Sequence, residues 1–412
     1  MKKRKILIML IMVIIYIFLS KGISGSCNEA NNAISQEDIN KIQEAYDESE
    51  ESLDKLYDYI NKIKSNNEVL NELTPKEYVK NYIINGKGEK TESILINALV
   101  SLIFKEVNVV LKFGISIIAI SILCSLLKNL QDAFSSKGVS EIAFYACYTV
   151  IIIVITKSFL ISIQVAKDVV DDISSFMNAL LPVLVSMTAL SGGVLEAAAL
   201  DPVIMSVVTI IPKIYKDVII PLILITFVLQ FVNNLSSEQK ISGFCKMIKK
   251  TTMWLQGFVV TISIAILSIR GLTSNTLDAV TLKTTKFAID NFIPIVGKSF
   301  SDAITSVASY SLIIKNAVSA LGLLVIVLIV LYPVIKIVLM IFIYKFSAAV
   351  VEPVSDKRIV NSISSTGECM VILLSSVLTI SLMFFILIGV MASSSRFIIG
   401  GWCFGSNSKI YS

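Results

Sequence analysis

The sequence contains no histidine, and this absence removes several classes of chemistry at once. Ser-His-Asp triads, His-ligated zinc sites and histidine proton relays are excluded. Charged residues are scarce as well, at 16% of the chain against about 25% in soluble globular proteins. Hydrophobic residues make up 55% of the chain, and the mean hydropathy is +0.78. The composition therefore argues against an ordinary soluble enzyme and for a protein whose solvent is largely lipid.

Other familiar signatures are also missing. The six cysteines form no Cys-x-x-Cys pair, so we interpret them as small buried hydrophobes rather than as a redox or metal site. No glycine-rich phosphate loop with its lysine is present, so the chain cannot drive transport by hydrolysing ATP. Positive charges are scattered through apolar sequence rather than gathered in a basic domain. We therefore expect a non-enzymatic protein with no catalytic residues, no cofactor, no metal and no nucleic-acid partner.

Residues 1–26 have the pattern of a secretory signal sequence. A basic stretch precedes an apolar core from Ile6 to Leu19, and small residues follow this core. The core has 14 residues, which is short for a spanning helix, although an uncleaved signal anchor is an open alternative. Cys27 resembles a lipoprotein acceptor only weakly, because the aliphatic residue expected three places upstream is absent. In either case the next segment is predicted to be extracytoplasmic.

Residues 27–106 are predicted to form an acidic, helical, extracytoplasmic segment. Apolar residues recur at spacings of three or four from Ile39 to Ile63, as on one face of a helix. A second, shorter helix is predicted to begin at Thr74-Pro75, because proline is favoured in a first helical turn. The acidic run between these apolar positions is more simply a solvated helix face than a cation site.

From about residue 107 onward, long apolar runs alternate with short polar breaks. We assign residues 107–395 to a transmembrane domain and residues 396–412 to a tail. A helix needs about 20 residues to cross a hydrocarbon layer of about 30 Å, and backbone in lipid must satisfy its own hydrogen bonds. The predicted fold is therefore all-α, a polytopic helical membrane protein with about six spans. These spans are residues 107–127, 142–163, 218–235, 251–270, 317–343 and 369–391.

Two further apolar stretches, residues 173–212 and 286–316, are interrupted by glycine, proline and charge. We predict re-entrant or broken helices there, because irregular backbone at membrane depth is tolerated where it is buried in protein or lines a wet cavity. Asn178–Pro182 aligns with Asp290–Pro294 at an offset of 112 residues, which reflects either an internal repeat or shared composition. The candidate hinges are Pro182, Gly192, Gly193, Pro294, Gly297 and Pro333.

Charges within apolar runs are the main functional lead, because an unpaired charge in hydrocarbon costs several kcal/mol on most scales. The alternative for most of them is ordinary helix capping, and Lys112 and Lys157 are explained by side chains that reach the membrane interface. Lys336 is harder to explain in this way, since it lies three residues after Pro333 within an apolar run. The candidate polar path consists of Glu196, Asp201, Asp290, Lys298, Asp302, Lys315 and Lys336.

Several strings along the chain resemble one family, the stage III sporulation protein AE family of endospore-forming bacteria. The longest is GLTSNTLDAVTLKTTKFAIDNFIPIVG at residues 271–297. Arg270 and Ala279 depart from the glutamine and glycine that are usual there. The other matching strings are FMNALLPVLVSMTALSGG (176–193), Ile220-Pro221-Leu222 with VNNLS (232–236), SLIIKNAVSALGL (311–323), YPVIKI (332–337) and EPVSDKRI (352–359).

The resemblance implies a permease-like membrane component of the assembly that joins mother cell and forespore. The protein would lie in the mother-cell-derived outer forespore membrane, beside other membrane proteins of the same sporulation complex and with its extracytoplasmic face in the intermembrane space. That complex resembles a secretion or feeding channel. No catalytic residue and no transported substrate come with the family.

Two other functions stay open at this point. One is a stand-alone secondary transporter of a small molecule, and the other is a purely structural scaffold of the complex. The partners that we expect are the lipid bilayer and membrane proteins of the complex, with homo-oligomers as a further possibility.

Overall fold

The computed structural model describes residues 50–64, 70, 73–85, 91–134, 137–235, 241–266 and 297–393. No strand occurs in these ranges, which confirms the predicted all-α fold. A helix also covers residues 242–266. The other elements are α3 (Glu50–Lys64), α4 (Pro75–Asn85), α5 (Thr91–Phe134), α6 (Lys137–Leu190), α7 (Val194–Ile214), the π-helix η2 (Tyr215–Ile219), α8 (Ile220–Leu235), α10 (Gly297–Val351) and α11 (Lys357–Ser393).

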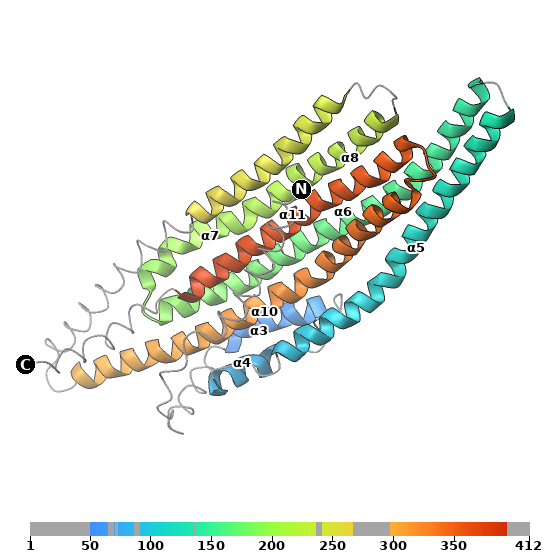
Figure 1. Cartoon of the computed structure of the whole chain (residues 1–412). Helices are drawn as coiled ribbons and strands as arrows, with labels where there is room; N and C mark the ends of the chain where they lie inside the picture. Colours follow the sequence, from blue (N-terminus) through green and yellow to red (C-terminus); the bar gives the residue numbers. More distant parts are fainter. Residues whose placement is uncertain are drawn as a thin grey trace, which may run out of the picture.

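The long helices run along one common direction and form an elongated bundle (Figure 1). α10 and α11 pack closely against each other, and α10 also packs against α5 and α6. At one end of the bundle, α5 and the start of α6 form a hairpin that extends past the other helices (Figure 1). The short helices α3 and α4 lie against α6 and α10, respectively, away from this end (Figure 1).

The described helices are apolar enough to confirm a membrane protein. Five of the six predicted spans coincide, wholly or nearly so, with parts of five long apolar stretches. The sixth, 251–270, overlaps the helix over residues 242–266 and continues past the described residues. The five stretches that are long and apolar enough to cross a membrane are Val100–Asn129, Tyr145–Leu190, Ile204–Leu235, Ser306–Val351 and Lys357–Ala392.

Residues 173–212 do not form a separate broken segment of the predicted kind. α6 continues without interruption through Pro182, and α7, η2 and α8 follow one another as a continuous helical rod that includes three more prolines. The chain turns only after Leu190, where Gly192 has a φ of 93° that side chains rarely adopt. The predicted break is therefore correct at Gly192 and Gly193 and wrong at the proline, because one missing hydrogen bond does not end a helix that packs along its whole length.

The second predicted broken segment also differs from the structure. Residues 297–316 are the first part of α10, which begins at Gly297 and runs through Pro333 without ending. The expectation of a break in residues 297–316 is therefore wrong. Residues 286–296 lie outside the described part of the chain, so the repeat proposed between Asn178–Pro182 and Asp290–Pro294 stays a prediction.

The acidic segment forms amphipathic helices, as its spacing predicts. α4 begins at Pro75, and Thr74 donates a hydrogen bond of 2.8 Å from its hydroxyl to the Glu77 carboxylate at this helix start. α3 buries Leu53, Leu56 and Ile60 completely and exposes charged side chains on its other face. The apolar face of α3 packs on α6 rather than on a core of its own.

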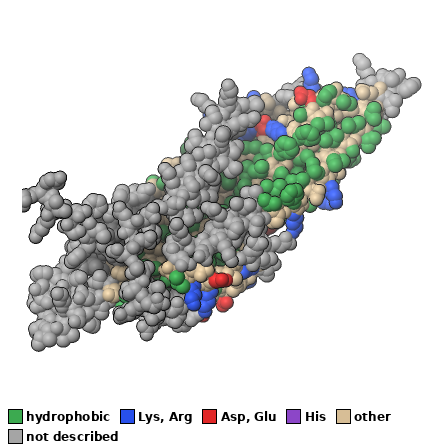
Figure 2. All heavy atoms as spheres, turned by 60° about the horizontal axis from the view of Figure 1, so that its bottom comes forward, with side chains coloured by type: hydrophobic (Ala, Val, Ile, Leu, Met, Phe, Trp, Pro, Cys, Tyr) green, Lys and Arg blue, Asp and Glu red, His purple; other side chains and the backbone are tan. Residues whose placement is uncertain are grey.

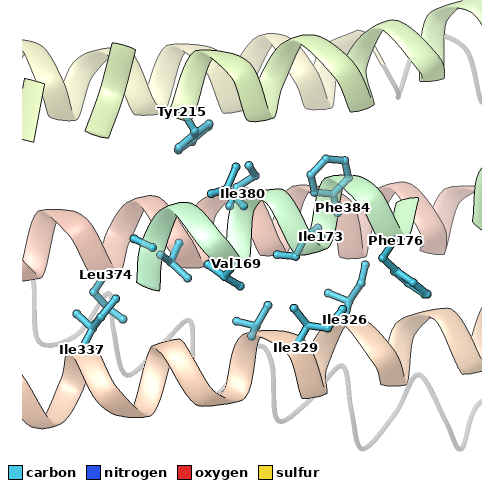
Figure 3. Close-up of a cluster of buried hydrophobic side chains, with 14 of the residues drawn as sticks. Val169, Ile173, Phe176, Tyr215, Ile326, Ile329, Ile337, Leu374, Ile380 and Phe384 are labelled. Carbon is cyan, nitrogen blue, oxygen red and sulfur yellow. The ribbon is translucent and has the colours of Figure 1, made fainter. Parts of the chain in front are cut away.

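The centre of the bundle is a dry core built by four helices. Figure 3 shows Val169, Ile173 and Phe176 of α6 among side chains of α10 and α11, with Tyr215 of η2 on the far side of α6. Burying a large aliphatic or aromatic side chain stabilises a fold by about 1.5–3 kcal/mol when water is the alternative. In lipid this gain is smaller, and close packing supplies more of the stability.

A polar latch joins α5 to the turn between α10 and α11. Lys128 forms an ion pair of 2.6 Å with Asp356, and the backbone N–H of Arg358 donates to the same carboxylate at 2.8 Å. Ser125 and Ser355 share a hydrogen bond of 2.7 Å beside it. Burial alone would raise the pKa of Asp356, but these hydrogen bonds and the charge of Arg358 outweigh it and lower this pKa to about 2.

We expect Asp356→Asn to destabilise the protein by about 2 kcal/mol at pH 7, since it removes the ion pair and weakens the cap of α11. The folded pKa lies below the ordinary value of 3.8, so the stabilisation is present above about pH 4 and is lost as the pH falls toward 2. The measurement is thermal unfolding in detergent across pH 2–7. Glu352→Gln, which changes an exposed carboxylate nearby, serves as the control. A gap between Asp356→Asn and the parent that stayed constant across this pH range would contradict the prediction.

Candidate functional site

Lys336 lies in α10 with a buried carboxylate beside it. Its Nζ donates to the hydroxyl of Tyr332 at 2.7 Å and lies 5.1 Å from the centre of the same ring. The Glu106 Oε2 atom from α5 lies 3.6 Å from this Nζ, which is beyond hydrogen-bonding distance. The side chains of Lys336 and Glu106 are only 13% and 6% exposed, so the two charges face each other inside the bundle.

Three carboxylates of α6 lie close by on one side of that helix. Asp168, Asp171 and Asp172 have spacings of three and one residues, which place them on one helical face. Lys216 of η2 pairs with Asp171 at 2.6 Å, and Gln164 donates to Asp168 at 2.7 Å.

A pocket of about 340 Å³ lies between α6 and α10 at this level. Tyr332 lines it and also holds the Lys336 ammonium, so the pocket adjoins the Lys336–Glu106 pair. The pocket is lined by Val165, Asp168, Val169, Asp171, Asp172, Ile329, Tyr332 and Pro333.

The π-helix places Lys216 beside Asp171, which lines this pocket. η2 begins shortly after Pro212, and the N–H of Ile220 bonds to the carbonyl of Tyr215 five residues back. The extra residue per turn shifts the register of the rod, and such π-segments occur frequently at functional sites.

Together these groups form a polar layer across an otherwise apolar bundle, consisting of Glu106, Asp168, Asp171, Asp172, Lys216, Tyr332 and Lys336. Two of its four carboxylates face a lysine: Asp171 pairs with Lys216, and Glu106 lies beside Lys336. In the described ranges, no group of three or more Cys, Asp and Glu side chains is arranged to hold a metal ion. The pocket in this layer can instead hold water or a polar solute beside the charged side chains.

The structure brings only part of the predicted polar path to this layer. Lys336 belongs to it, and the predicted hinge Pro333 lines its pocket. Lys315 lies farther along α10 and is fully buried. Glu196 and Asp201 lie in α7, and Lys298 and Asp302 near the start of α10; their side chains fall outside the described set, as does Asp290 altogether. The functional role of all seven residues stays a prediction.

Sequence reasoning misses Glu106 and the three aspartates. Glu106 directly precedes the predicted span 107–127 and resembles a charged residue that flanks a membrane span. The aspartates fall between the predicted segments 142–163 and 173–212. The signal that marks them is the spacing of carboxylates at i, i+3 and i+4 within a single continuous helix, which becomes visible only when residues 142–190 are taken as one helix.

Comparison with known proteins places the chain in a family. The model of the stage III sporulation protein AE family matches residues 73–395. The chain belongs to the stage III sporulation protein AE family. The protein of that name from Bacillus subtilis (strain 168) is 30% identical over 313 residues, which are 76% of this chain and 78% of the relative. No solved structure matches the chain.

Membership in the stage III sporulation protein AE family, together with the long apolar helices, makes this a sporulation-associated membrane protein. The matched range includes the whole polar layer, from Glu106 to Lys336, and the latch at Asp356. It also includes α4 and excludes α3.

Proposed function

We propose that this protein is a non-enzymatic subunit of a channel or secretion-like complex that links mother cell and forespore, and that it forms a permease-like core of that complex. Family membership supports the sporulation role and a multi-protein setting. The observation that favours a transport role over a scaffold is the pocket of about 340 Å³ that three aspartates of α6 line, beside the buried Lys336–Glu106 pair. A scaffold has no need for a buried charge pair, since taking two charges out of water costs stability.

The proposal places the protein in the mother-cell-derived outer forespore membrane, among membrane partners of the same complex. α3 and α4 would then face the intermembrane space, where their charged side chains offer a surface to those partners. The polar layer lies at the level of α3, so a solute that passes between the two cells would meet it first on this side.

The test is neutralisation of the pocket in sporulating cells. We expect Asp168→Asn, Asp171→Asn and Asp172→Asn together to reduce heat-resistant spores and late forespore gene expression strongly, while the level of the protein in the membrane is unchanged. Glu352→Gln, far from the pocket on the α10–α11 turn, should sporulate normally. If the triple variant formed as many heat-resistant spores as the parent, the pocket would have no part in the function.

Flux measurements on the purified protein and on the purified complex distinguish a stand-alone transporter, a scaffold and a channel subunit. A stand-alone transporter would move small polar solutes across liposomes without partners. A scaffold would co-purify with stable partners and would show no flux, alone or in the complex. A channel subunit requires its partners for flux, and the triple Asp→Asn variant should abolish that flux.

A further inference from the structure

α6 is too long for a single hydrocarbon layer. Its apolar stretch Tyr145–Leu190 has 46 residues, which is about 69 Å of helix. The hydrocarbon core of a bilayer is about 30 Å thick, and even a tilt of about 40° leaves this stretch about 53 Å tall. A substantial part of α6 must therefore lie outside the hydrocarbon, and the question is which part.

The exposed face of α6 changes from apolar to polar at Gln164. Before this residue the exposed side chains are mostly large and apolar, and after it they are polar or small. The exposed large apolar residues before it are Ile142, Tyr145, Val150, Ile153, Leu160 and Ile161. The exposed residues after it are Asp168, Asp171, Ser175, Asn178, Pro182, Ser186 and finally Leu190.

The neighbouring helices change at the same level. Lys216 of η2, which is paired with Asp171, is followed by α8 with an exposed apolar face. α10 exposes no side chain from residue 308 to 337 and then exposes Val338, Phe342 and Phe346. On the face shown in Figure 2, hydrophobic side chains cover a broad area with few charges among them. The apolar surface thus ends on α6, α8 and α10 at the polar layer.

α3 supports the same boundary from outside. Its Tyr59 side chain lies beside Ser175 of α6, beyond Gln164. α3 exposes Asp54, Lys55 and Asp58 at that level, and side chains of this kind are not stable in hydrocarbon. Water or lipid headgroups must therefore reach the surface of α6 near Ser175.

The lysines on the apolar side of the polar layer are compatible with a membrane boundary at this layer. Lys112 and Lys157 lie six and seven residues from Glu106 and Gln164, which is about 10 Å of helix, so their long side chains can reach the interface. Lys345 and Lys249 both pair with Glu368.

We infer that the bilayer surrounds the bundle on the side of residues 145–163, 218–235 and 338–351, and that the α6–α7 hairpin, residues 171–212, stands outside it in water on the side of α3. The occupant of the apolar surface is lipid hydrocarbon. The hairpin is then a helical projection above the membrane rather than a re-entrant segment. This placement does not depend on the proposed function.

The test is a depth measurement on the full-length protein in lipid nanodiscs. Single cysteines that carry an environment-sensitive fluorophore are placed on α6 at Ile153 and Leu160 and at Ser175 and Asn178, in a cysteine-free background that still supports sporulation. Lipids with nitroxide-labelled acyl chains should quench the first pair strongly and should leave the second pair unquenched. A water-soluble quencher should give the opposite pattern.

Met205 and Ile210 provide the decisive control, because they are exposed apolar residues within the hairpin. If the hairpin stands outside the membrane, lipid nitroxides leave both unquenched. If the hairpin instead lines a pore within the bilayer, both are quenched while Ser175 and Asn178 remain open to the aqueous quencher. Quenching by lipid at Met205 and Ile210, or at Ser175 and Asn178, would overturn the placement.

Discussion

Lys336→Met is expected to destabilise the folded protein by on the order of 3 kcal/mol, because it leaves the Glu106 carboxylate buried with no cation beside it. The Glu106 side chain is 6% exposed, and its Oε2 atom accepts no hydrogen bond among the described residues. Unfolding in detergent, followed by helix content, measures this loss. Spore formation should fall with the stability of the protein in the membrane.

A double variant separates the charge pair from the packing of Lys336. Glu106→Gln with Lys336→Met removes both charges at once and should recover most of the lost stability, since two neutral side chains need no compensation. Tyr332→Phe removes only the hydroxyl that accepts from Lys336 and should cost about 1 kcal/mol. If the double variant were as unstable as Lys336→Met alone, the pairing would not be the cause.

Gly114→Leu is expected to push α5 away from α10 and to cost about 3 kcal/mol or more, on the scale of the largest overpacking effects. A Cβ at Gly114 would lie 2.3 Å from Ile343 Cγ1 and 2.5 Å from Cδ1, so the helices approach each other through the missing side chain. Close approach through glycine is a main source of helix association in membranes, where burial in lipid gives little driving force. Thermal unfolding of the purified variant and its abundance in the membrane measure the effect.

The same substitution elsewhere provides a matched control. Gly257 lies in a helix where an added Cβ would meet nothing within 4 Å, so Gly257→Leu should be tolerated. Ile343→Ala creates space opposite Gly114, and Gly114→Ala with Ile343→Ala should be more stable than Gly114→Ala alone. Equal stability of these two variants would show that the contact with Ile343 does not limit the approach of α5.

The local sequence pattern predicts α3 and α4 well. α4 begins at Pro75, where the sequence indicates a start, and α3 buries Leu53, Leu56 and Ile60 at the predicted spacing. Pattern succeeds there because capping and amphipathic spacing act within a few residues. It fails for α6 and α10, whose prolines and polar residues are held in helix by neighbours that are distant in sequence.

The candidate site is predictable only one side chain at a time. Lys336 is recognisable as a charge within an apolar run, but its partner Glu106 lies 230 residues earlier on another helix. Nothing local at residue 106 indicates that it faces inward, since a carboxylate before a span is typical of a membrane flank. The pairing follows from how α5 packs on α10, and no local pattern contains that information.

α10 is continuous over 55 residues, which is about 80 Å. One end of α10 lies in the region of α3 and α4, where α4 packs on it. The other end leads into the turn that the Lys128–Asp356 ion pair holds. An intact α-helix resists axial compression. A displacement applied to α10 near α4 therefore moves the whole helix instead of bending it at a break. A displacement of the end of α10 near α4 is therefore expected to reach the turn that Lys128 and Asp356 hold.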